Sequence, residues 1–261
     1  MARTAAFFDL DKTIIARSSS LAFSRPFYRG GLINRSAMLR SAYAQFVYVL
    51  GGADHDQMEK MRASMSEMVT GWDVLRVKEI VAETLHELID PMIYDEAAAL
   101  IEEHKAGGRD IVIVSSSGTE VVEPIGELLG ADEVVATRMV VEDGRYTGDI
   151  EFYAYAENKA VAMRELAERN GYDLAECYGY SDSFTDLPML DAVGHPFVVN
   201  PDKQLRRVAT ERGWEILLFT TPVALRRRLP RPNRLTAATL GAVGAAAVGL
   251  AWYSTRRARA T

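Results

Sequence analysis

Residues 7–13 read Phe7-Phe8-Asp9-Leu10-Asp11-Lys12-Thr13 and place two carboxylates at the end of a short apolar run. The run from Ala5 to Leu10 is predicted to be a buried strand, and the two-residue period of a strand predicts that Asp9 and Asp11 point the same way. Neighbouring carboxylates repel each other, which raises the pKa of one of them unless a cation binds. Mg²⁺ prefers oxygen ligands and suits this pair, although a solvated turn with helix-capping acids has the same pattern.

Strands and helices alternate through most of the first 225 residues. Apolar runs predict further strands over Ile111–Val114, Cys177–Tyr180, Phe197–Val199 and Glu215–Phe219. Residues Met139–Ile150 are predicted to form a β-hairpin that turns at Asp143-Gly144. Helical spacing predicts helices over Asp95–Lys105, from the residues after Gly118 to about Gly130, and over Glu157–Asn170. The pattern indicates the α/β class, with a Rossmann-like parallel sheet core flanked by helices and ligands bound at the strand ends.

One long segment interrupts this alternation. Between about Ser18 and Asp90 the apolar residues follow helical spacing, and glycines mark the turns; the clearest series is Met58, Met61, Met65 and Met68. We therefore expect an inserted helical cap over 16–92 and a core formed by 1–15 and 93–225. The methionines either fill the interior of the cap or line a hydrophobic pocket.

Composition excludes several classes of protein. With 261 residues, 48% of them hydrophobic and 25% charged, the chain can form a sizeable core and is neither disordered nor collagen-like. Its single cysteine, Cys177, cannot form an intrachain disulfide or a multi-cysteine metal site. Eight of the 30 lysines and arginines and none of the 36 acids lie beyond residue 225, so the body carries 22 bases against 36 acids. Such a body repels a polyphosphate backbone, and no nucleic-acid partner is expected.

The chain beyond residue 225 is basic and apolar. Residues 226–234 form a basic juxtamembrane linker, and 235–254 are predicted to be a transmembrane helix, because 236–253 hold no charge and would span roughly 27 Å as a helix. A buried alanine-rich helix or a loose tail is the alternative. Residues 255–261 form a basic tail, and the excess of arginines before the span favours a single-pass protein of the cell membrane with its body in the cytoplasm. A second helix could pack on the small-residue stripe formed by Ala237, Gly241, Ala245 and Gly249.

Three further motifs contribute polar residues, and each is weak by itself. Ser115 follows an apolar strand, Lys159 lies at the start of a helix, and Asp182 and Asp186 are four residues apart. Such residues are more often a turn serine, a solvated lysine and one face of a helix. Together with the first motif, however, they match the pattern of one known family.

In this order, and with the helical insertion between the first and second motifs, residues 5–225 resemble the haloacid dehalogenase-like hydrolases. The resemblance is to their subfamily IB, which includes phosphoserine phosphatases. It implies a Mg²⁺-dependent phosphatase in which Asp9 attacks phosphorus and becomes aspartyl-phosphate, while Asp11 serves as general acid and base. It also implies that Asp9, the backbone carbonyl of Asp11, and Asp182 hold the metal.

The resemblance assigns supporting roles to the remaining residues of the four motifs. Ser115, Ser116 and Thr185 would bind the phosphoryl oxygens, and Lys159 would neutralise their charge. Thr13 would support the loop that carries the nucleophile, and Asp186 would shape the water shell of the metal.

Two positions depart from the pattern of the amino-acid phosphatases. Ser18 stands where those enzymes have a glutamate that binds the substrate amino group, and Thr185 replaces an asparagine. A site that lacks its polar partner discriminates poorly. Together with the predicted anchor, this favours a hydrophobic or lipid-linked phosphomonoester over a phosphoserine, which remains the alternative small-molecule substrate.

A different class of protein has a similar residue inventory. Receiver-like regulatory modules also combine acids, a hydroxyl residue, a lysine and Mg²⁺, but they retain their phosphoaspartate as a signal. The acids here lie on the first predicted strand, and a long helical insertion follows them. Both features favour the hydrolase.

Overall fold

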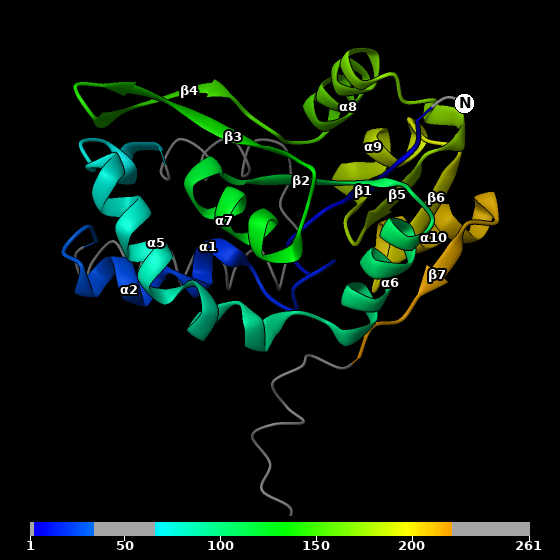
Figure 1. Ribbon diagram of the computed structural model, residues 1–261, viewed down its shortest axis with the longest axis horizontal. Helices are drawn as coiled ribbons and strands as arrows, with labels where there is room; N and C mark the ends of the chain where they lie inside the picture. The colour runs from blue at the N-terminus through cyan, green and yellow to red at the C-terminus, as the bar shows by residue number, and fades with distance from the viewer. Residues whose placement is uncertain (1–2, 34–65, 221–261) are drawn as a thin grey trace, which may run out of the picture. The chain divides into compact units, whose positions relative to one another are not determined.

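A sheet of seven strands forms the centre of the molecule (Figure 1). The computed structural model describes residues 3–33 and 66–220. Within them the strands run in the order β4-β3-β2-β1-β5-β6-β7, and all neighbours are parallel except β3 and β4. This confirms the predicted α/β class. The strands are β1 (Ala5–Phe8), β2 (Asp110–Gly118), β3 (Glu133–Glu142), β4 (Arg145–Phe152), β5 (Tyr178–Ser181), β6 (His195–Val199) and β7 (Glu215–Leu217).

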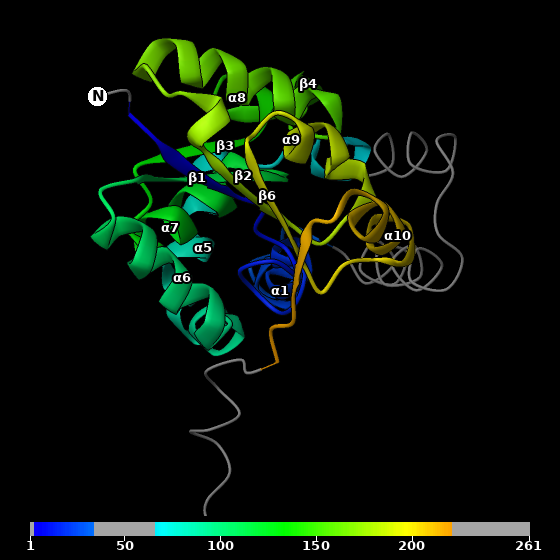
Figure 2. The same cartoon turned by 90° about the vertical axis from the view of Figure 1, so that its right-hand side faces the viewer.

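Helices cover both faces of the sheet, so the central strands consist of buried residues. Successive side chains of β1 enter opposite layers: Phe7 packs in the cluster that holds Met163 of α8, and Phe8 packs in the cluster that holds Ile125 of α7. Figures 1 and 2 show α8 on one side of the strands and α6 on the other. These helices are α6 (Asp95–Ala106), α7 (Thr119–Leu129), α8 (Glu157–Asn170), α9 (Leu187–Asp191) and α10 (Lys203–Arg212), with the short 3₁₀ turns η2 (Leu174–Glu176) and η3 (Phe184–Asp186).

The predicted elements match the structure in kind, but β3 begins earlier than expected and helix α10 was not predicted. The strand β3 begins at Glu133, well before the expected Met139, because its first half pairs in parallel with β2 and only its second half forms the hairpin with β4. Periodicity did not reveal α10, because few of its side chains are apolar. Its start is instead fixed by Asp202, whose side chain accepts hydrogen bonds from the backbone of Gln204 and Leu205.

The regular elements that the structure describes in the insertion between β1 and β2 are all helical. Its elements are α1 (Ser19–Ala22), α2 (Ser24–Arg29), α5 (Val74–Leu88) and the 3₁₀ turn η1 (Asp90–Met92). Helix α5 packs on α7 of the sheet layer and on α2. Met58, Met61 and Met65 lie outside the described residues, and the predicted boundaries of the cap stay predictions.

Within 3–33 and 66–220, no helix has both the length and the apolar character needed to cross a membrane. The predicted span over 235–254, the linker before it and the tail after it lie outside these ranges. The same is true of the stripe of small residues at positions 237, 241, 245 and 249. The anchor therefore stays a prediction.

A buried histidine joins the sheet to α6. The Nε2 atom of His104 lies 2.8 Å from the hydroxyl of Tyr180, and its Nδ1 accepts a hydrogen bond of 2.7 Å from Nε of Arg109. Burial and, to a lesser extent, the nearby Arg109 guanidinium lower the pKa of His104 to about 4. Nδ1 is already occupied as an acceptor, so a proton there would break the bond to Arg109.

We predict that His104 makes the fold sensitive to acid. Below about pH 6.5 the unfolded chain protonates this side chain, whereas the folded chain does not until about pH 4. Stability from the neutral histidine is therefore complete above pH 6.5 and is lost as the pH falls. The free energy of unfolding in urea is measured at pH 7 and at pH 5. Its decrease between these two pH values should be about 1–2 kcal/mol smaller for His104→Gln than for the natural chain. The exposed His86→Gln is the control, and equal falls in all three chains would refute the assignment.

Candidate active site

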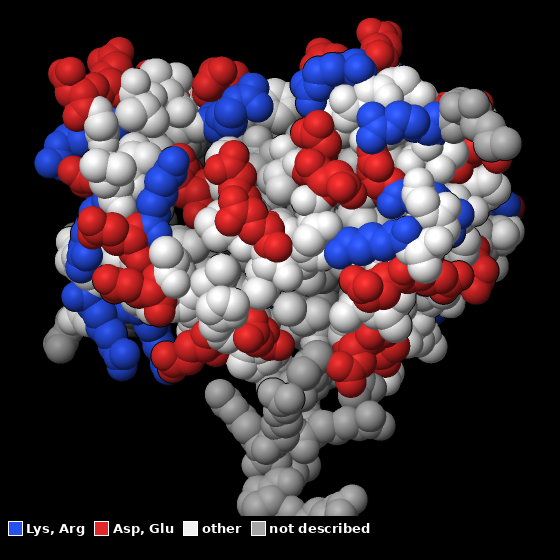
Figure 3. Space-filling view, in the orientation of Figure 1, with Lys and Arg blue, Asp and Glu red and all other residues white. Residues whose placement is uncertain are grey.

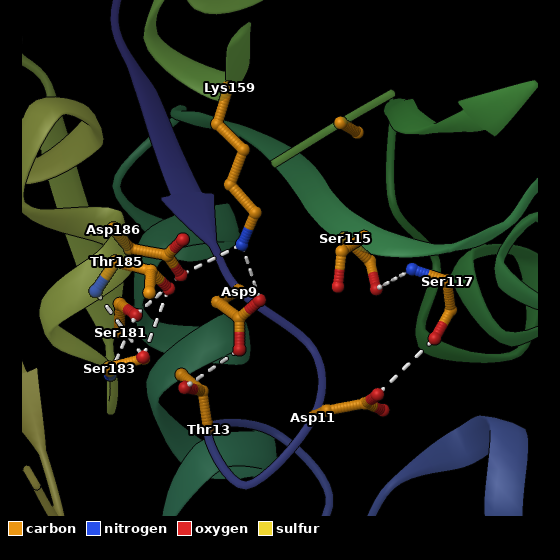
Figure 4. Close-up of polar contacts among 12 residues, drawn as sticks. Asp9, Asp11, Thr13, Ser115, Ser117, Lys159, Ser181, Ser183, Thr185 and Asp186 are labelled. Carbon is orange, nitrogen blue, oxygen red and sulfur yellow. Dashed lines mark hydrogen bonds and ion pairs between the residues drawn. The ribbon is translucent and has the colours of Figure 1, made fainter. Parts of the chain in front are cut away.

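The site lies at the carboxyl edge of the parallel strands, next to β1. Strands that follow β1 in the sequence are added first on one side of it and later on the other. The strand β1 has β2 on one side and β5 on the other, so residues that follow all three strands meet at one edge. Asp9 directly follows β1, and its backbone N–H donates to the carbonyl of Tyr180 in β5. The close-up in Figure 4 shows the side chains gathered there.

The centre of the site is a buried lysine between two buried carboxylates. The Nζ of Lys159 donates to Oδ1 of Asp9 and to Oδ2 of Asp186, both at 2.7 Å (Figure 4). Each of the three residues is at most 6% exposed. Burial disfavours the charged lysine, but the two carboxylates outweigh that cost and raise the pKa of Lys159 above its usual value. The ammonium group therefore stays charged beside Asp9, the carboxylate that the resemblance implies is the nucleophile.

Helix α8 brings Lys159 into this position. The chain enters the helix through Ala156, whose φ of 50° is unusual for a residue other than glycine. Lys159 lies in the first turn of α8, and the helix ends at Gly171 in a left-handed conformation that stops it. The conformation at the start of α8 thus places the Lys159 side chain so that it extends from the helix to the end of the sheet.

More negative than positive charge is buried at the site. Burial, together with the nearby Asp9 carboxylate, raises the pKa of Asp182 well above its usual value. Burial likewise raises the pKa of Asp9 to about 7, against the opposing effect of Lys159. Asp186 is the third acid, and Lys159 and Lys12 offset part of the negative charge. A group of oxygen ligands with an excess of negative charge fits a hard divalent cation, which would restore both carboxylates to their charged forms.

The predicted metal ligands combine side-chain and backbone oxygens. In the described part of the chain, no three His, Cys, Asp or Glu side chains are grouped as a metal site. The set implied by the resemblance differs from such a group, because Asp9 and Asp182 would contribute side chains and Asp11 its carbonyl oxygen. The residues present thus fit Mg²⁺ through the chemistry of their oxygens.

The loop after β5 holds Asp186 in place. The hydroxyl of Ser181 donates to Oδ2 of Asp186 at 2.7 Å, and the backbone N–H of Ser183 donates to Oγ of Ser181 at 3.3 Å. Oγ of Ser183 in turn lies 3.0 Å from Oγ1 of Thr185. The predicted phosphate contact Thr185 therefore belongs to a hydroxyl network beside Asp186 (Figure 4).

The loop after β1 turns sharply and separates the two motif acids. The hydroxyl of Thr13 donates to Oδ2 of Asp9 at 3.2 Å, which supports the role expected for Thr13. Lys12 has a φ of 65°, and its N–H donates to the carbonyl of Ile15. Because β1 ends at Phe8, the period of a strand does not extend through this loop.

The expectation that Asp9 and Asp11 point the same way is therefore wrong. Asp9 faces Lys159, whereas Asp11 faces Ser117 (Figure 4). The carboxylate of Asp11 accepts from the hydroxyl of Ser117 at 3.2 Å and from the backbone N–H of Ser19 at 2.8 Å. Burial raises the pKa of Asp11, against the opposing effect of these hydrogen bonds.

The two serines predicted to bind phosphate occupy different environments. Ser115 is buried, and its Oγ accepts from the backbone N–H of Ser117 at 3.2 Å, which leaves its own proton available to a ligand. Ser116 is exposed, and its carbonyl accepts from the hydroxyl of Thr137. The structure thus brings Asp9, Lys159 and Asp186 into direct contact and places Ser115 on the adjacent strand end.

Three serines of the site were not identified from the sequence: Ser19, Ser117 and Ser181. Ser181 and Ser117 are direct neighbours of motif residues, and their hydroxyls contact motif carboxylates. Clustering of serines at Ser18-Ser19-Ser20 and Ser115-Ser116-Ser117 was a signal that could have identified two of them. The contact itself was not predictable, because these runs lie about a hundred residues apart.

Comparisons with known proteins agree with this geometry. The family described as haloacid dehalogenase-like hydrolase matches residues 6–191. A Streptomyces azureus protein named "Inhibition of morphological differentiation protein" is 65% identical, covering 98% of this chain and 94% of the relative. A Mycobacterium tuberculosis protein named "Probable phosphatase Rv3661" is 58% identical over 98% of this chain and 90% of the relative. Another from that organism, named "Phosphoserine phosphatase SerB1", is 32% identical over 95% and 80%.

Solved structures share the fold. The crystal structure of a Bordetella pertussis protein of unknown function has a TM-score of 0.73 and 28% identity, covering 83% of this chain and 99% of that chain. A substrate-bound phosphoserine phosphatase has a TM-score of 0.60 at 19% identity, covering 87% and 97%. The family match covers more than half of the chain, and together with the relatives named phosphatase it supports the predicted enzyme class, a phosphatase. The chain belongs to the haloacid dehalogenase-like hydrolase family.

Proposed function

We propose that this chain is a Mg²⁺-dependent phosphomonoesterase that works through a phosphoryl group on Asp9. The observation that carries the proposal is the position of Lys159, which touches Asp9 at 2.7 Å while Asp186 holds it from the other side. A charged amine at this point stabilises negative charge on a phosphoryl group bound next to Asp9. A carboxylate nucleophile needs that help, because it and the substrate are both anions.

The proposed reaction has two steps. An oxygen of Asp9 attacks phosphorus, the ester P–O bond breaks, and the leaving oxygen takes the bonding electrons and a proton from Asp11. Asp11 then takes a proton from water, whose oxygen attacks phosphorus and releases phosphate from Asp9. Lys159 and Ser115 would hold the phosphoryl oxygens in both steps. Asp9, the carbonyl of Asp11, and Asp182 would hold Mg²⁺, which supplies positive charge to the phosphoryl oxygens.

We further propose that the substrate is a hydrophobic or lipid-linked phosphate taken at a membrane surface. The last described residues lie at the catalytic edge: Thr220 donates its backbone N–H to Glu96, and Phe219 pairs with Asn200, which follows β6. The predicted anchor begins only about 15 residues later, so membrane insertion would tether the body to a lipid surface. Phosphoserine is the alternative, supported by the 32% identical relative with that name.

The charge on the surface agrees with a non-nucleic-acid substrate. On the face drawn in Figure 3, acidic and basic side chains are interspersed. The body as a whole carries more acids than bases. We accordingly propose a phosphomonoester, and not a nucleic acid, as the partner of the site.

We predict that Asp9→Asn lowers kcat on p-nitrophenyl phosphate by roughly 10³-fold or more, because the amide is a far weaker nucleophile. The fold should persist, since Lys159 keeps its bond to Asp186. Phosphate release and thermal melting measure the two effects. The exposed Asp149→Asn is the matched control. Unchanged turnover in Asp9→Asn would contradict the assignment of Asp9 as the nucleophile. If the natural chain released one phosphate per molecule and then stopped, a receiver-like module would be favoured.

We also predict that a chelator abolishes turnover and that added Mg²⁺ restores it. Asp182→Asn should raise the Mg²⁺ concentration for half-maximal activity by roughly tenfold or more, because one charged ligand is lost. Isothermal titration with Mg²⁺ alone gives a readout that does not depend on turnover. Asp149→Asn should match the natural chain in both measurements. An unchanged Mg²⁺ requirement in Asp182→Asn would exclude Asp182 as a ligand.

For the membrane, we predict that a chain ending at Pro230 loses sedimentation with vesicles, while the full chain retains it, because the apolar span is gone. The truncated chain should keep its activity on p-nitrophenyl phosphate. On the full chain, kcat/KM for lysophosphatidate or phosphatidylglycerophosphate should exceed that for phosphoserine. Continued sedimentation of the shortened chain would mean that the tail is not the anchor, and a preference for phosphoserine would reject a lipid-linked substrate.

A further inference from the structure

A cluster of three serine hydroxyls contacts the proposed general acid and base through Ser117. The Oγ of Ser117 lies 3.2 Å from Oδ2 of Asp11, 2.9 Å from Oγ of Ser19 and 3.1 Å from Oγ of Ser20. Ser117 is 7% exposed and Ser19 is fully buried. The two serines of α1 belong to the inserted segment, whereas Ser117 belongs to β2 of the sheet. The cluster therefore connects Asp11 with both parts of the chain.

The number of protons that each hydroxyl can donate limits the directions of the hydrogen bonds in the cluster. A hydroxyl has one proton to donate and two lone pairs to accept with. Ser117 donates to the carboxylate of Asp11, and its two lone pairs can accept from the hydroxyls of Ser19 and Ser20. All hydrogen-bonding positions of the Ser117 hydroxyl are then used, and its proton points to the carboxylate of Asp11. The other oxygen of Asp11 is held by the N–H of Ser19 at 2.8 Å, so each carboxylate oxygen has its own donor.

An irregularity in β2 positions Ser117 toward Asp11. The pairing of β2 with β3 is regular up to Ser115 and then shifts, so that the next paired residue is Gly118. Ser116 and Ser117 are therefore not paired with β3. The hydroxyl of Thr137 donates a hydrogen bond of 2.8 Å to the carbonyl of Ser116. Bulges of this kind change the direction of a side chain near a site. The backbone N–H of Ser117 meanwhile donates to Ser115, the predicted phosphate ligand.

We propose that Ser117 is a positioning residue that fixes the orientation of the Asp11 carboxyl group, with Ser19 as its partner from the inserted segment. It acts through Asp11 and does not touch the substrate. The proposal deepens the proposed function and rests on it, because orientation of Asp11 matters only if Asp11 transfers a proton. The hydroxyl cluster then makes efficient proton transfer depend on α1 being docked against β2.

The test uses the dependence of rate on the leaving group. A leaving group that is a poor anion needs a proton from Asp11, whereas a good one needs it much less. For Ser117→Ala, kcat/KM on phenyl phosphate should fall by about five- to tenfold, as expected for loss of one hydrogen bond, and by less than about twofold on p-nitrophenyl phosphate. A residue that only stabilises the fold would reduce both rates equally. Ser24→Ala is the control, because Ser24 lies in the same segment and its hydroxyl bonds the carbonyl of Leu21.

A double-mutant cycle shows whether Ser117 acts through Asp11. In an Asp11→Ala background, Ser117→Ala should cause no further selective loss on phenyl phosphate. Ser117→Thr, which keeps a hydroxyl, should recover part of the rate. If Ser117→Ala does not fold, Ser19→Ala replaces it, because it removes a donor to Ser117 and leaves its own backbone N–H on Asp11.

Each outcome decides the proposal. Selective loss on phenyl phosphate that disappears in the Asp11→Ala background supports it. Equal loss on both substrates, no loss on either, or a selective loss that persists without Asp11 overturns it. Failure of the proposed function looks different, because the natural chain would then hydrolyse neither aryl phosphate, or Asp9→Asn would hydrolyse both as well as the natural chain does.

Discussion

The ammonium group of Lys159 is the element on which the rest of the site depends. It is buried at the end of the sheet and holds Asp9 and Asp186 at 2.7 Å each. Removing the lysine charge would leave two buried carboxylates without a positive partner, which is strongly destabilising. The trio therefore fixes three segments relative to one another: the loop after β1, the start of α8 and the loop after β5. Catalytic geometry and local stability arise from the same contacts.

The topology of the sheet explains why residues so distant in sequence meet. The strand β1 lies between β2 and β5, and all three run in parallel. Their carboxyl ends supply Asp9, Ser115 and Asp182 in turn, and α8 adds a lysine 150 residues away from Asp9. The insertion between β1 and β2 then contributes Ser19 to the same edge. Sheet and insertion thus share the residues that the reaction needs.

The sequence alone predicted the sheet, the helical insertion and the four motifs, because these depend on hydrophobic period and on the order of residue types. It did not predict what depends on local backbone geometry. Asp11 points away from Asp9 because β1 ends at Phe8, before either acid, and Ser117 reaches Asp11 because β2 is irregular after Ser115. Helix α10 was missed because charge outweighs its apolar side. Its start at Asp202 depends on a capping contact, which hydrophobic period does not describe.

The central claim is that Asp9 carries the phosphoryl group during turnover. Its most direct test is to mix the full chain with substrate and Mg²⁺, quench with acid within a turnover, and map the phosphorylated residue by mass spectrometry. The account predicts a phosphoryl group on Asp9 that appears and decays at rates compatible with kcat. Turnover that proceeds with no phosphorylated Asp9, or with the phosphoryl group on a different residue, would contradict it.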